Sequence, residues 1–251
     1  MKLSVVIPVF NEAARILPSL ECLFAYMDQH HPDYEVLLVD DGSTDGTATL
    51  VRQQFARRSQ LRILSYTGNR GKGYAVRFGS VRAAGDTVLM TDADLSTPIE
   101  ELEKLLPLLA QGYDLVIGSR ALAQSEIRRR QPFYRESGGK VFNLLVRLIV
   151  LPDVHDTQCG FKVFRREPLL PVLEQQQIDG FAFDVEMIAL ARARGLKVAE
   201  VPVVWINSPT SRVRMRAALR AFADLVLIRR RVRQAGTRTQ QVSAARPDAP
   251  N

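Results

Sequence analysis

The sequence of 251 residues is poor in cysteine and has no long apolar run. Its two cysteines, Cys22 and Cys159, are too few for a disulfide framework and do not have metal-ligand spacing, so a reducing compartment is expected. No stretch approaches the roughly 18 apolar residues that span a bilayer. Met1-Lys2 leads directly into a strand-like run. We therefore expect neither a membrane span nor a secretory signal.

Acidic residues are in the minority, with 27 Asp and Glu against 34 Lys and Arg, for a formal net charge of +7. Such an excess calls for an anionic partner, which could be a nucleotide, a nucleic acid or lipid head groups. Aromatic residues make up only 7% of the chain, and we find no RNA- or DNA-binding motif. The sequence therefore argues against a nucleic-acid partner.

Apolar runs alternate with helical patterns over the first 120 residues. Asn11 is expected to cap the first helix. Strands are predicted at 3–9, 35–41, 61–66, 86–91 and 113–119, with further helices at about 47–58, 73–84 and 98–110. This alternation predicts an α/β fold with a mostly parallel central sheet and helices on both faces. Ligands of such sheets bind beyond the carboxyl ends of the strands.

The second half is less regular. We predict an apolar helix at 138–152, an extended piece at 156–164, a helix at 184–194, a strand at 196–203 and a helix with eight arginines over 212–233. The tail after Gln234 is polar, contains two prolines and has no apolar period, which is typical of disorder.

Two aspartates in "TDADLSTP" stand at a predicted strand end. Side chains two apart on a strand point the same way, so Asp92 and Asp94 would repel each other unless a cation lies between them. Mg²⁺ or Mn²⁺ takes a few carboxylate oxygens and leaves other positions for phosphate. The alternative is a solvated turn that caps the helix after Pro98. The position at the ligand edge of an α/β sheet favours metal–diphosphate binding.

Other strand ends carry residues suited to a nucleotide. Asp40 and Asp41 can accept hydrogen bonds from a base, or can simply form the turn of "DDGSTDG". A base pocket would be completed by Pro8, Phe10, Asn11 and Glu12. The glycine-rich, basic "GNRGKGYA" (68–75) suits close backbone approach to phosphates, although it lacks P-loop spacing.

The ordered motifs "VVIPVFNE", "VDDGSTDGT", "NRGKGYAVR", "TDADLSTP", "IGSR", "DTQCGFKVF" and "FAFDVEM" resemble the family 2 glycosyltransferases of the GT-A fold. More narrowly, they are similar to the polyprenyl-phosphate hexosyltransferases, nearest to the dolichyl-phosphate β-glucosyltransferase branch. The resemblance covers about residues 3–233. It implies a hexosyltransferase that moves glucose from UDP-glucose to dolichyl or undecaprenyl phosphate with inversion, using Mg²⁺ or Mn²⁺. Alternatives are a GDP-mannose-dependent mannosyltransferase and a family 2 enzyme with another acceptor.

Carried onto this sequence, the resemblance implies a set of site residues. The nucleotide-binding residues would be Pro8, Phe10, Asn11, Glu12, Asp40, Asp41, Lys72, Asp92 and Ala93. Asp92 and Asp94 would ligate the metal, while Ser96 stands where mannosyl-transferring relatives have a glutamine ligand, which weakens the mannose alternative. The residues expected to act in catalysis are Asp94, Arg120, Arg135, Asp156, Asp184 and Arg212.

Their expected roles follow from charge. Arg120 and Arg135 would hold the acceptor phosphate, and Arg212 would meet the donor diphosphate or the acceptor phosphate. Asp156 or Asp184 would position the acceptor or act as a base, with a slight preference for Asp156; Asp184 could instead cap a helix. A lipid phosphate is already an anionic nucleophile, so a strong base is not obligatory. Arginines and a metal would stabilise the remaining charges.

The resemblance also implies an organisation of the chain. A catalytic domain would span 1–211, with a nucleotide-binding half (1–120) and an acceptor-binding half (121–211). A basic amphipathic helix (212–234) and a disordered tail (235–251) would follow. The helices at 137–151 and 212–233 would lie on an anionic membrane, pack on the sheet or mediate self-association. We expect a cytoplasmic protein, peripheral on the inner face of the cytoplasmic membrane. A nucleotidyltransferase also pairs carboxylates with metal, but its Gly-rich, Arg-Lys signature is missing near the N-terminus.

Overall fold

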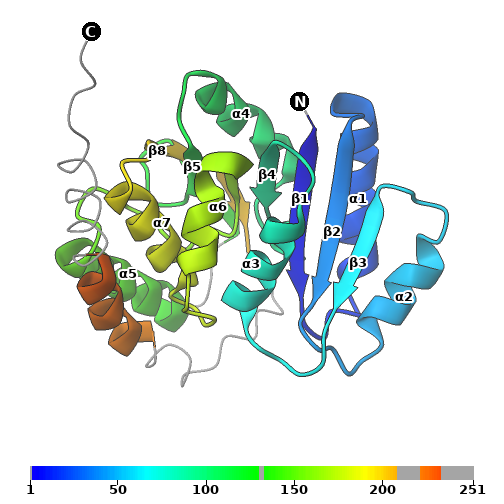
Figure 1. The fold of residues 1–251 in the computed structure, drawn as a ribbon, viewed down its shortest axis with the longest axis horizontal. Helices are drawn as coiled ribbons and strands as arrows, with labels where there is room; N and C mark the ends of the chain where they lie inside the picture. The colour runs from blue at the N-terminus through cyan, green and yellow to red at the C-terminus, as the bar shows by residue number, and fades with distance from the viewer. Residues whose placement is uncertain (1, 130–132, 208–220, 233–251) are drawn as a thin grey trace, which may run out of the picture.

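A central sheet of seven strands organises the molecule (Figure 1). The computed structural model describes residues 2–129, 133–207 and 221–232, with the backbone alone for 133–135. The strands of the sheet are β1 (Leu3–Val9), β2 (Tyr34–Asp40), β3 (Leu61–Ser65), β4 (Thr87–Met90), β5 (Leu115–Ser119), β7 (Lys162–Arg165) and β8 (Val198–Pro202). Their spatial order is β3-β2-β1-β4-β7-β5-β8. A separate parallel pair consists of β6 (Glu126–Arg129) and β9 (Val204–Ile206).

Helices cover both faces of the sheet, as the alternating pattern predicted (Figure 1). One face packs against α1 (Ile16–His30), α2 (Thr47–Gln54), η1 (Ile99–Glu101) and α4 (Leu102–Ala110). The other packs against α3 (Lys72–Arg82), α5 (Phe133–Ile149), α6 (Arg166–Gln175), α7 (Phe183–Ala193) and the helical residues 221–232. The sequence pattern did not reveal α6, β6 or β9.

The apolar runs form strands because both of their faces are buried. Every residue of β2 and β4 is buried. Along β1, Val5 packs in one core layer and Val6 in the other; along β2, Val36 and Leu37 alternate in the same way. A central parallel strand therefore reads as continuously apolar, without the alternation of a half-exposed strand.

The register brings the strand ends to one edge. Val9 pairs with Asp40 and Asp40 with Ser65, so β1, β2 and β3 end at the same level. All neighbouring strands run parallel except β7, which is antiparallel to β4 and β5. Lys162, the first residue of β7, lies opposite Met90, the last of β4. The segment before β7 therefore reaches the edge where the parallel strands end, the lower edge of the sheet in Figure 1.

Two predictions about helices need comment. Asn11 does not cap α1, which begins at Ile16 with Arg15 at its N-cap position. Asn11 instead adopts a left-handed backbone with a φ of 57°, and its Oδ1 accepts a hydrogen bond from the Thr44 N–H at 2.8 Å. Residues 221–232 confirm part of the helix predicted over 212–233, while the tail 235–251 lies outside the described residues. Among the helices that the structure describes, none combines the length and apolarity needed to cross a membrane.

Candidate active site

The two aspartates after β4 are each paired with a cation. Lys72 Nζ lies 2.5 Å from Asp92 Oδ1, and Arg15 Nη1 lies 3.3 Å from Asp94 Oδ2. Asp94 Oδ1 accepts the Ser96 N–H at 3.1 Å. The side chain of Asp92 is 38% exposed and that of Asp94 is 17% exposed. The repulsion between the two carboxylates is thus offset by cations at the start of α1 and at the start of α3.

These cations remain charged. Hydrogen bonds to Glu12 raise the pKa of Arg15, and the nearby charges of Asp94 and Asp92 add to that effect. Burial by itself lowers the pKa of Lys72, but the charges of the surrounding aspartates outweigh it, so that this pKa lies above its usual value. The charges of Asp92 and Asp94 raise the pKa of Arg15 and also that of Lys72, so the four groups form one electrostatic cluster.

The residues at this site fit a hard divalent cation whose coordination is shared between the protein and a bound diphosphate. Within residues 2–129, 133–207 and 221–232, no three His, Cys, Asp or Glu side chains gather in a way that could hold a metal. Ser96 is buried, and its carbonyl accepts the Ile206 N–H at 2.7 Å. Asp92 and Asp94 provide carboxylate oxygens, the type of donor that Mg²⁺ and Mn²⁺ prefer, and the remaining positions suit phosphate oxygens.

Arg15 is a site residue that the sequence reasoning missed. Its Nε contacts Glu12 Oε2, and its Nη2 donates to Glu12 Oε1 at 2.6 Å. The Glu12 N–H is held by Thr47 Oγ1 at 2.9 Å. Arg15 therefore ties the loop after β1 to Asp94 after β4. The signal was present as an acidic and a basic residue three positions apart, a spacing at which side chains meet on a helical turn.

The remaining residues predicted for the nucleotide lie along the same edge. Pro8 pairs with a β2 residue inside the sheet, and Phe10 beyond it exposes 42% of its surface. The Asp40 carboxylate accepts the Ser43 N–H at 3.0 Å. Ala93 is buried between the two aspartates. Their contacts with a nucleotide stay predictions.

Asp41 is fully engaged by one loop. Its carboxylate accepts hydrogen bonds from Tyr66 Oη at 2.9 Å and Asn69 Nδ2 at 2.9 Å. It also accepts the backbone N–H groups of residues 70 and 71 at 2.7 and 2.9 Å. Four donors on a buried carboxylate give Asp41 a clear structural role, which is to hold the loop that leads into Lys72.

Gly71 and Gly73 allow two segments of the protein to pack closely. A Cβ on Gly71 would lie 2.4 Å from the carbonyl oxygen of Asp179, and one on Gly73 would lie 2.5 Å from Phe183 Cβ. The Gly73 N–H donates to the Asp179 carbonyl at 2.9 Å. At these two positions the backbone approaches residues 176–184, hereafter the support segment. The contact of the loop with phosphate stays a prediction.

Arg120, after β5, is held by a bidentate partner. Its Nε lies 2.7 Å from Asp156 Oδ2 and its Nη2 2.9 Å from Oδ1, and its backbone N–H donates to Oδ2 at 3.0 Å. Glu200 of β8 accepts the Asp156 N–H at 2.8 Å. Burial favours the neutral acid, but Arg120 lowers the pKa of Asp156 to about 2. This pairing argues against Asp156 as a base and for a role in positioning Arg120.

Asp184 lies in the first turn of α7 but does not cap it, because Ala182 occupies the N-cap position. Its Oδ1 accepts a 2.5 Å hydrogen bond from Nζ of Lys162, which is completely buried and also donates to the Cys159 carbonyl at 2.6 Å. Burial raises the pKa of Asp184, and Lys162 and Lys72 oppose this rise. The sequence reasoning also missed Lys162. The feature that could have revealed it is a charged residue at the first position of a buried strand.

The segment before β7 brings these groups together. A Cβ on Gly160 would lie 2.0 Å from Asp92 Oδ2, so the first aspartate of the pair packs directly on this backbone. Asp156, with its partner Arg120, belongs to the same segment, and Lys162 begins the strand that follows it. The cation-paired aspartates, the Arg120 ion pair and the buried lysine pair therefore converge on one edge.

The side chains of two arginines that were predicted to act in catalysis are not among those that the structure describes. Arg135 lies in α5 at a position where the backbone alone is described, and Arg212 lies outside the described residues. Their contacts with phosphate stay predictions.

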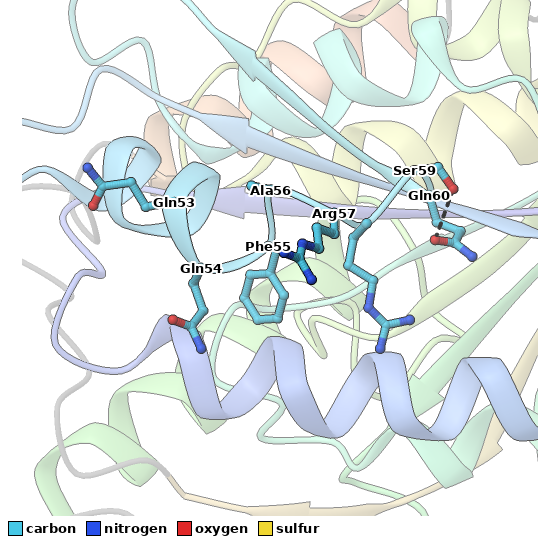
Figure 2. Close-up of a pocket in the computed structure, with 8 residues that line it drawn as sticks. Gln53, Gln54, Phe55, Ala56, Arg57, Ser59 and Gln60 are labelled. Atoms are coloured by element: carbon cyan, nitrogen blue, oxygen red, sulfur yellow. Dashed lines mark hydrogen bonds between the residues drawn. The ribbon is translucent and has the colours of Figure 1, made fainter.

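A surface depression of about 600 Å³ lies elsewhere (Figure 2). Residues 53–60 line it, between α2 and the start of β3, which places it at the opposite edge of the sheet. Phe55 packs on Phe24 with ring centroids 5.1 Å apart, and Arg58 pairs with Asp28 at 2.6 Å. The lining contains no carboxylate, and we assign it no part in the site.

Sequence relatives agree with the motifs. The family model described as "Glycosyl transferase family 2" matches residues 4–172. A dolichyl-phosphate beta-glucosyltransferase of Trichomonas vaginalis is 36% identical over 234 residues, covering 89% of this chain and 69% of the relative. The enzyme of that name from Saccharomyces cerevisiae is 33% identical over 246 residues, covering 90% and 74%. The one from Homo sapiens is 31% identical over 254 residues, covering 96% and 78%.

Solved structures share the fold. Mannosyl-3-phosphoglycerate synthase from Rubrobacter xylanophilus superposes with a TM-score of 0.70 at 24% identity, covering 100% of this chain and 79% of that one. Glucosyl-3-phosphoglycerate synthase from Mycobacterium tuberculosis, in complex with Mn²⁺, UDP-glucose and glycerol 3-phosphate, gives 0.63 at 22% identity, covering 91% and 79%. These likenesses confirm the predicted GT-A-like architecture. Because the family model covers more than half of the sequence, this chain is a glycosyltransferase that belongs to glycosyl transferase family 2.

Proposed function

We propose that this chain transfers glucose from UDP-glucose to a polyprenyl phosphate, with a divalent metal at Asp92 and Asp94. The observation that carries the proposal is the convergence of a cation-paired aspartate pair and an anchored arginine, Arg120, on one sheet edge. The names of the sequence relatives support glucose as the sugar and dolichyl phosphate as the acceptor. Neighbours solved with Mn²⁺ and UDP-glucose support the metal and the donor.

The donor half of the chemistry is electrostatic. A metal bound by Asp92 and Asp94 would neutralise charge on the diphosphate of the donor. Lys72 and Arg15 lie against the same two carboxylates and carry positive charge to the place where the leaving nucleoside diphosphate develops its negative charge. These fixed cations require no reorganisation during the reaction, which is what makes such a site effective.

The acceptor half needs an anion site more than a base. A phosphate oxygen of the lipid forms a bond to the anomeric carbon while the bond from that carbon to the diphosphate breaks, and UDP leaves with the electron pair. The nucleophile is already anionic, so no strong base is obligatory. Arg120 has a guanidinium oriented by Asp156 and lies 5.4 Å from the Trp205 ring. We propose that Arg120 binds the acceptor phosphate, with Arg135 and Arg212 as further contacts, and that β-linked product forms by inversion.

A lipid acceptor requires contact with a membrane, and α5 has a face suited to it. Phe142 and Val146 pack into the core, which settles that one side of this helix lies on the protein. Val141, Leu144 and Leu148 on the other side are 53%, 54% and 70% exposed. Spacings of three and four residues place them in one stripe along the helix. An amphipathic helix of this kind binds at the lipid head-group boundary.

Residues 221–232 add to the same proposal. Val226 and Leu227 are 50% and 45% exposed, and Arg229 in the same helical stretch is exposed as well. We propose that these helices rest on an anionic membrane at its cytoplasmic face. Flotation with anionic liposomes at low salt tests this, and failure to float would remove the membrane proposal. A concentration-dependent dimer in solution would instead show that the apolar faces cover each other in a homo-oligomer.

The transfer reaction has a direct test. The purified chain is incubated with Mn²⁺ or Mg²⁺, radiolabelled UDP-glucose or GDP-mannose, and dolichyl or undecaprenyl phosphate, and the mixture is extracted with organic solvent. We expect label in the organic phase from UDP-glucose and its loss on adding EDTA. Label from GDP-mannose alone would support the mannosyl alternative. A water-soluble product formed only with 3-phosphoglycerate would contradict a lipid acceptor.

A further inference from the structure

A fully buried glutamate connects the C-terminal helix to the support segment. The Glu186 side chain, on α7, has no exposed surface. Its Oε2 accepts the backbone N–H groups of Gln177 and Ile178 at 3.0 and 2.8 Å, and its Oε1 accepts Arg231 Nη1 at 2.9 Å. Arg231 Nη2 also donates to Gln177 Oε1 at 2.5 Å. Arg231 therefore supplies the positive charge that a buried carboxylate needs, and it also hydrogen-bonds to the start of the support segment.

The support segment also contacts α3. Arg77 Nη1 donates to the Gln176 carbonyl at 2.7 Å, and its Nη2 lies 2.8 Å from Asp179 Oδ1. The Asp179 carbonyl accepts the Gly73 N–H at 2.9 Å. Because the Cβ positions of Gly71 and Gly73 are blocked by this segment, the loop has no space to shift toward it. The residue between these two glycines is Lys72, so its location depends on where the support segment lies.

We propose that Arg231 is a positioning residue for the donor site. It holds Glu186, Glu186 holds the support segment, and the support segment holds Lys72 against Asp92. Every step of this path is a hydrogen bond or a close backbone contact between neighbouring groups. The link from Arg231 to Lys72 stands on geometry alone; its consequence for UDP-sugar binding rests on the proposed function.

The helix itself supplies a matched control. Leu225 and Ile228 are fully buried, and Arg231 continues the same face three residues further on. Arg230, one residue earlier, is exposed. Truncating Arg230 removes the same charge from the same helix turn and leaves the Glu186 contact in place.

The test compares wild type, Arg231→Ala and Arg230→Ala in the full chain by hydrogen exchange and by UDP titration in Mn²⁺. For Arg231→Ala we expect faster exchange in residues 68–75 and 176–184, and UDP affinity weaker by about 3- to 30-fold, the range typical of coupling through a packed network. The KM for UDP-glucose should rise while the KM for polyprenyl phosphate is unchanged. Arg231→Lys, which keeps the charge but loses the second hydrogen bond, should recover part of the affinity. Arg230→Ala should match wild type.

Three results would overturn the proposal. One is faster exchange confined to 221–232, with 68–75 unchanged. Another is an equal effect of Arg230→Ala, which would indicate a general charge effect. The third is unaltered UDP affinity in Arg231→Ala. If that variant does not fold, Arg231→Lys against Arg230→Ala decides by the same readouts. If wild type does not bind UDP, the proposed function fails, and hydrogen exchange alone still decides whether Arg231 controls the 68–75 loop.

Discussion

Replacing Asp156 by asparagine should destabilise the protein by an amount that depends on pH. The change keeps the shape of the side chain and removes the charge that Arg120 binds in bidentate fashion. Asp156 is 1% exposed, so solvent screens the pair little. Removing one partner of a buried ion pair costs about 3–5 kcal/mol. Because the Arg120 side chain that remains is 26% exposed, we expect the free energy of unfolding at pH 7 to fall by about 3 kcal/mol, the lower end of that range.

The sign of the pH dependence follows from the direction of the pKa shift. Arg120 depresses the pKa of Asp156 from 3.8 to about 2 in the folded protein. A depressed pKa stabilises the fold above the unfolded pKa, and this contribution disappears as the pH falls through the folded pKa. The shift corresponds to about 2 kcal/mol at pH 7, of which roughly half remains at pH 3. The difference between wild type and Asp156→Asn should therefore shrink between pH 5 and pH 2.

Urea denaturation followed by circular dichroism measures both quantities. The matched control is Asp153→Asn in the same loop, whose side chain is 65% exposed and pairs with Arg192 at 2.5 Å. Exposed pairs contribute little, so its effect should stay below about 1 kcal/mol at every pH. A difference for Asp156→Asn that is small at pH 7, or that does not change down to pH 3, would refute the assignment of Asp156 as the charged partner of Arg120.

Three further variants test the donor site. Asp94→Ala should abolish sugar transfer and Mn²⁺-dependent UDP binding while the circular dichroism spectrum stays native; full activity would contradict the metal role. Gly160→Ala should reduce turnover by at least about tenfold, because its Cβ would lie 2.0 Å from Asp92 Oδ2, whereas Gly180→Ala, where nothing lies within 4 Å, should behave as wild type. Arg15→Gln should lower the free energy of unfolding by about 1–3 kcal/mol, since it removes the charged hydrogen bonds to Glu12 and the nearby charge from Asp94. Mn²⁺ should raise the melting temperature of Arg15→Gln more than that of wild type, and an equal rise in both would disprove that Arg15 balances the charge of the aspartate pair.

Local sequence patterns were sufficient to predict the parallel strands of the sheet and to identify the aspartate pair. A run such as 3–9 is apolar throughout because a central parallel strand is buried on both sides, and that property is visible in the residues themselves. Asp92 and Asp94 are recognisable because two like charges at the end of such a run need a cation. The cap expected of Asn11 failed because a side chain that can cap a helix can equally bond to a neighbouring loop, here that of Thr44.

The partners of the charged groups required the folded chain. The pairs are far apart in the sequence: Asp156 and Arg120 are separated by 36 positions, Lys162 and Asp184 by 22, and Arg231 and Glu186 by 45. No local pattern reports such pairs. The glycines of 68–75 are a second example. Glycine in the sequence indicates that another group packs close to the backbone, but it does not indicate which group that is.

By itself, then, the order of residues indicated most of the strands and helices, although not α6, β6 or β9. It also determined which strand ends carry acids and the family to which the chain belongs. Tertiary structure decided which cation neutralises each acid, and with it whether a carboxylate is left to act as a base, to hold an arginine or to receive a metal. The physical reason is that burial and periodicity are properties of short segments, whereas the energy of a charge depends on everything that folding brings within a few ångströms of it.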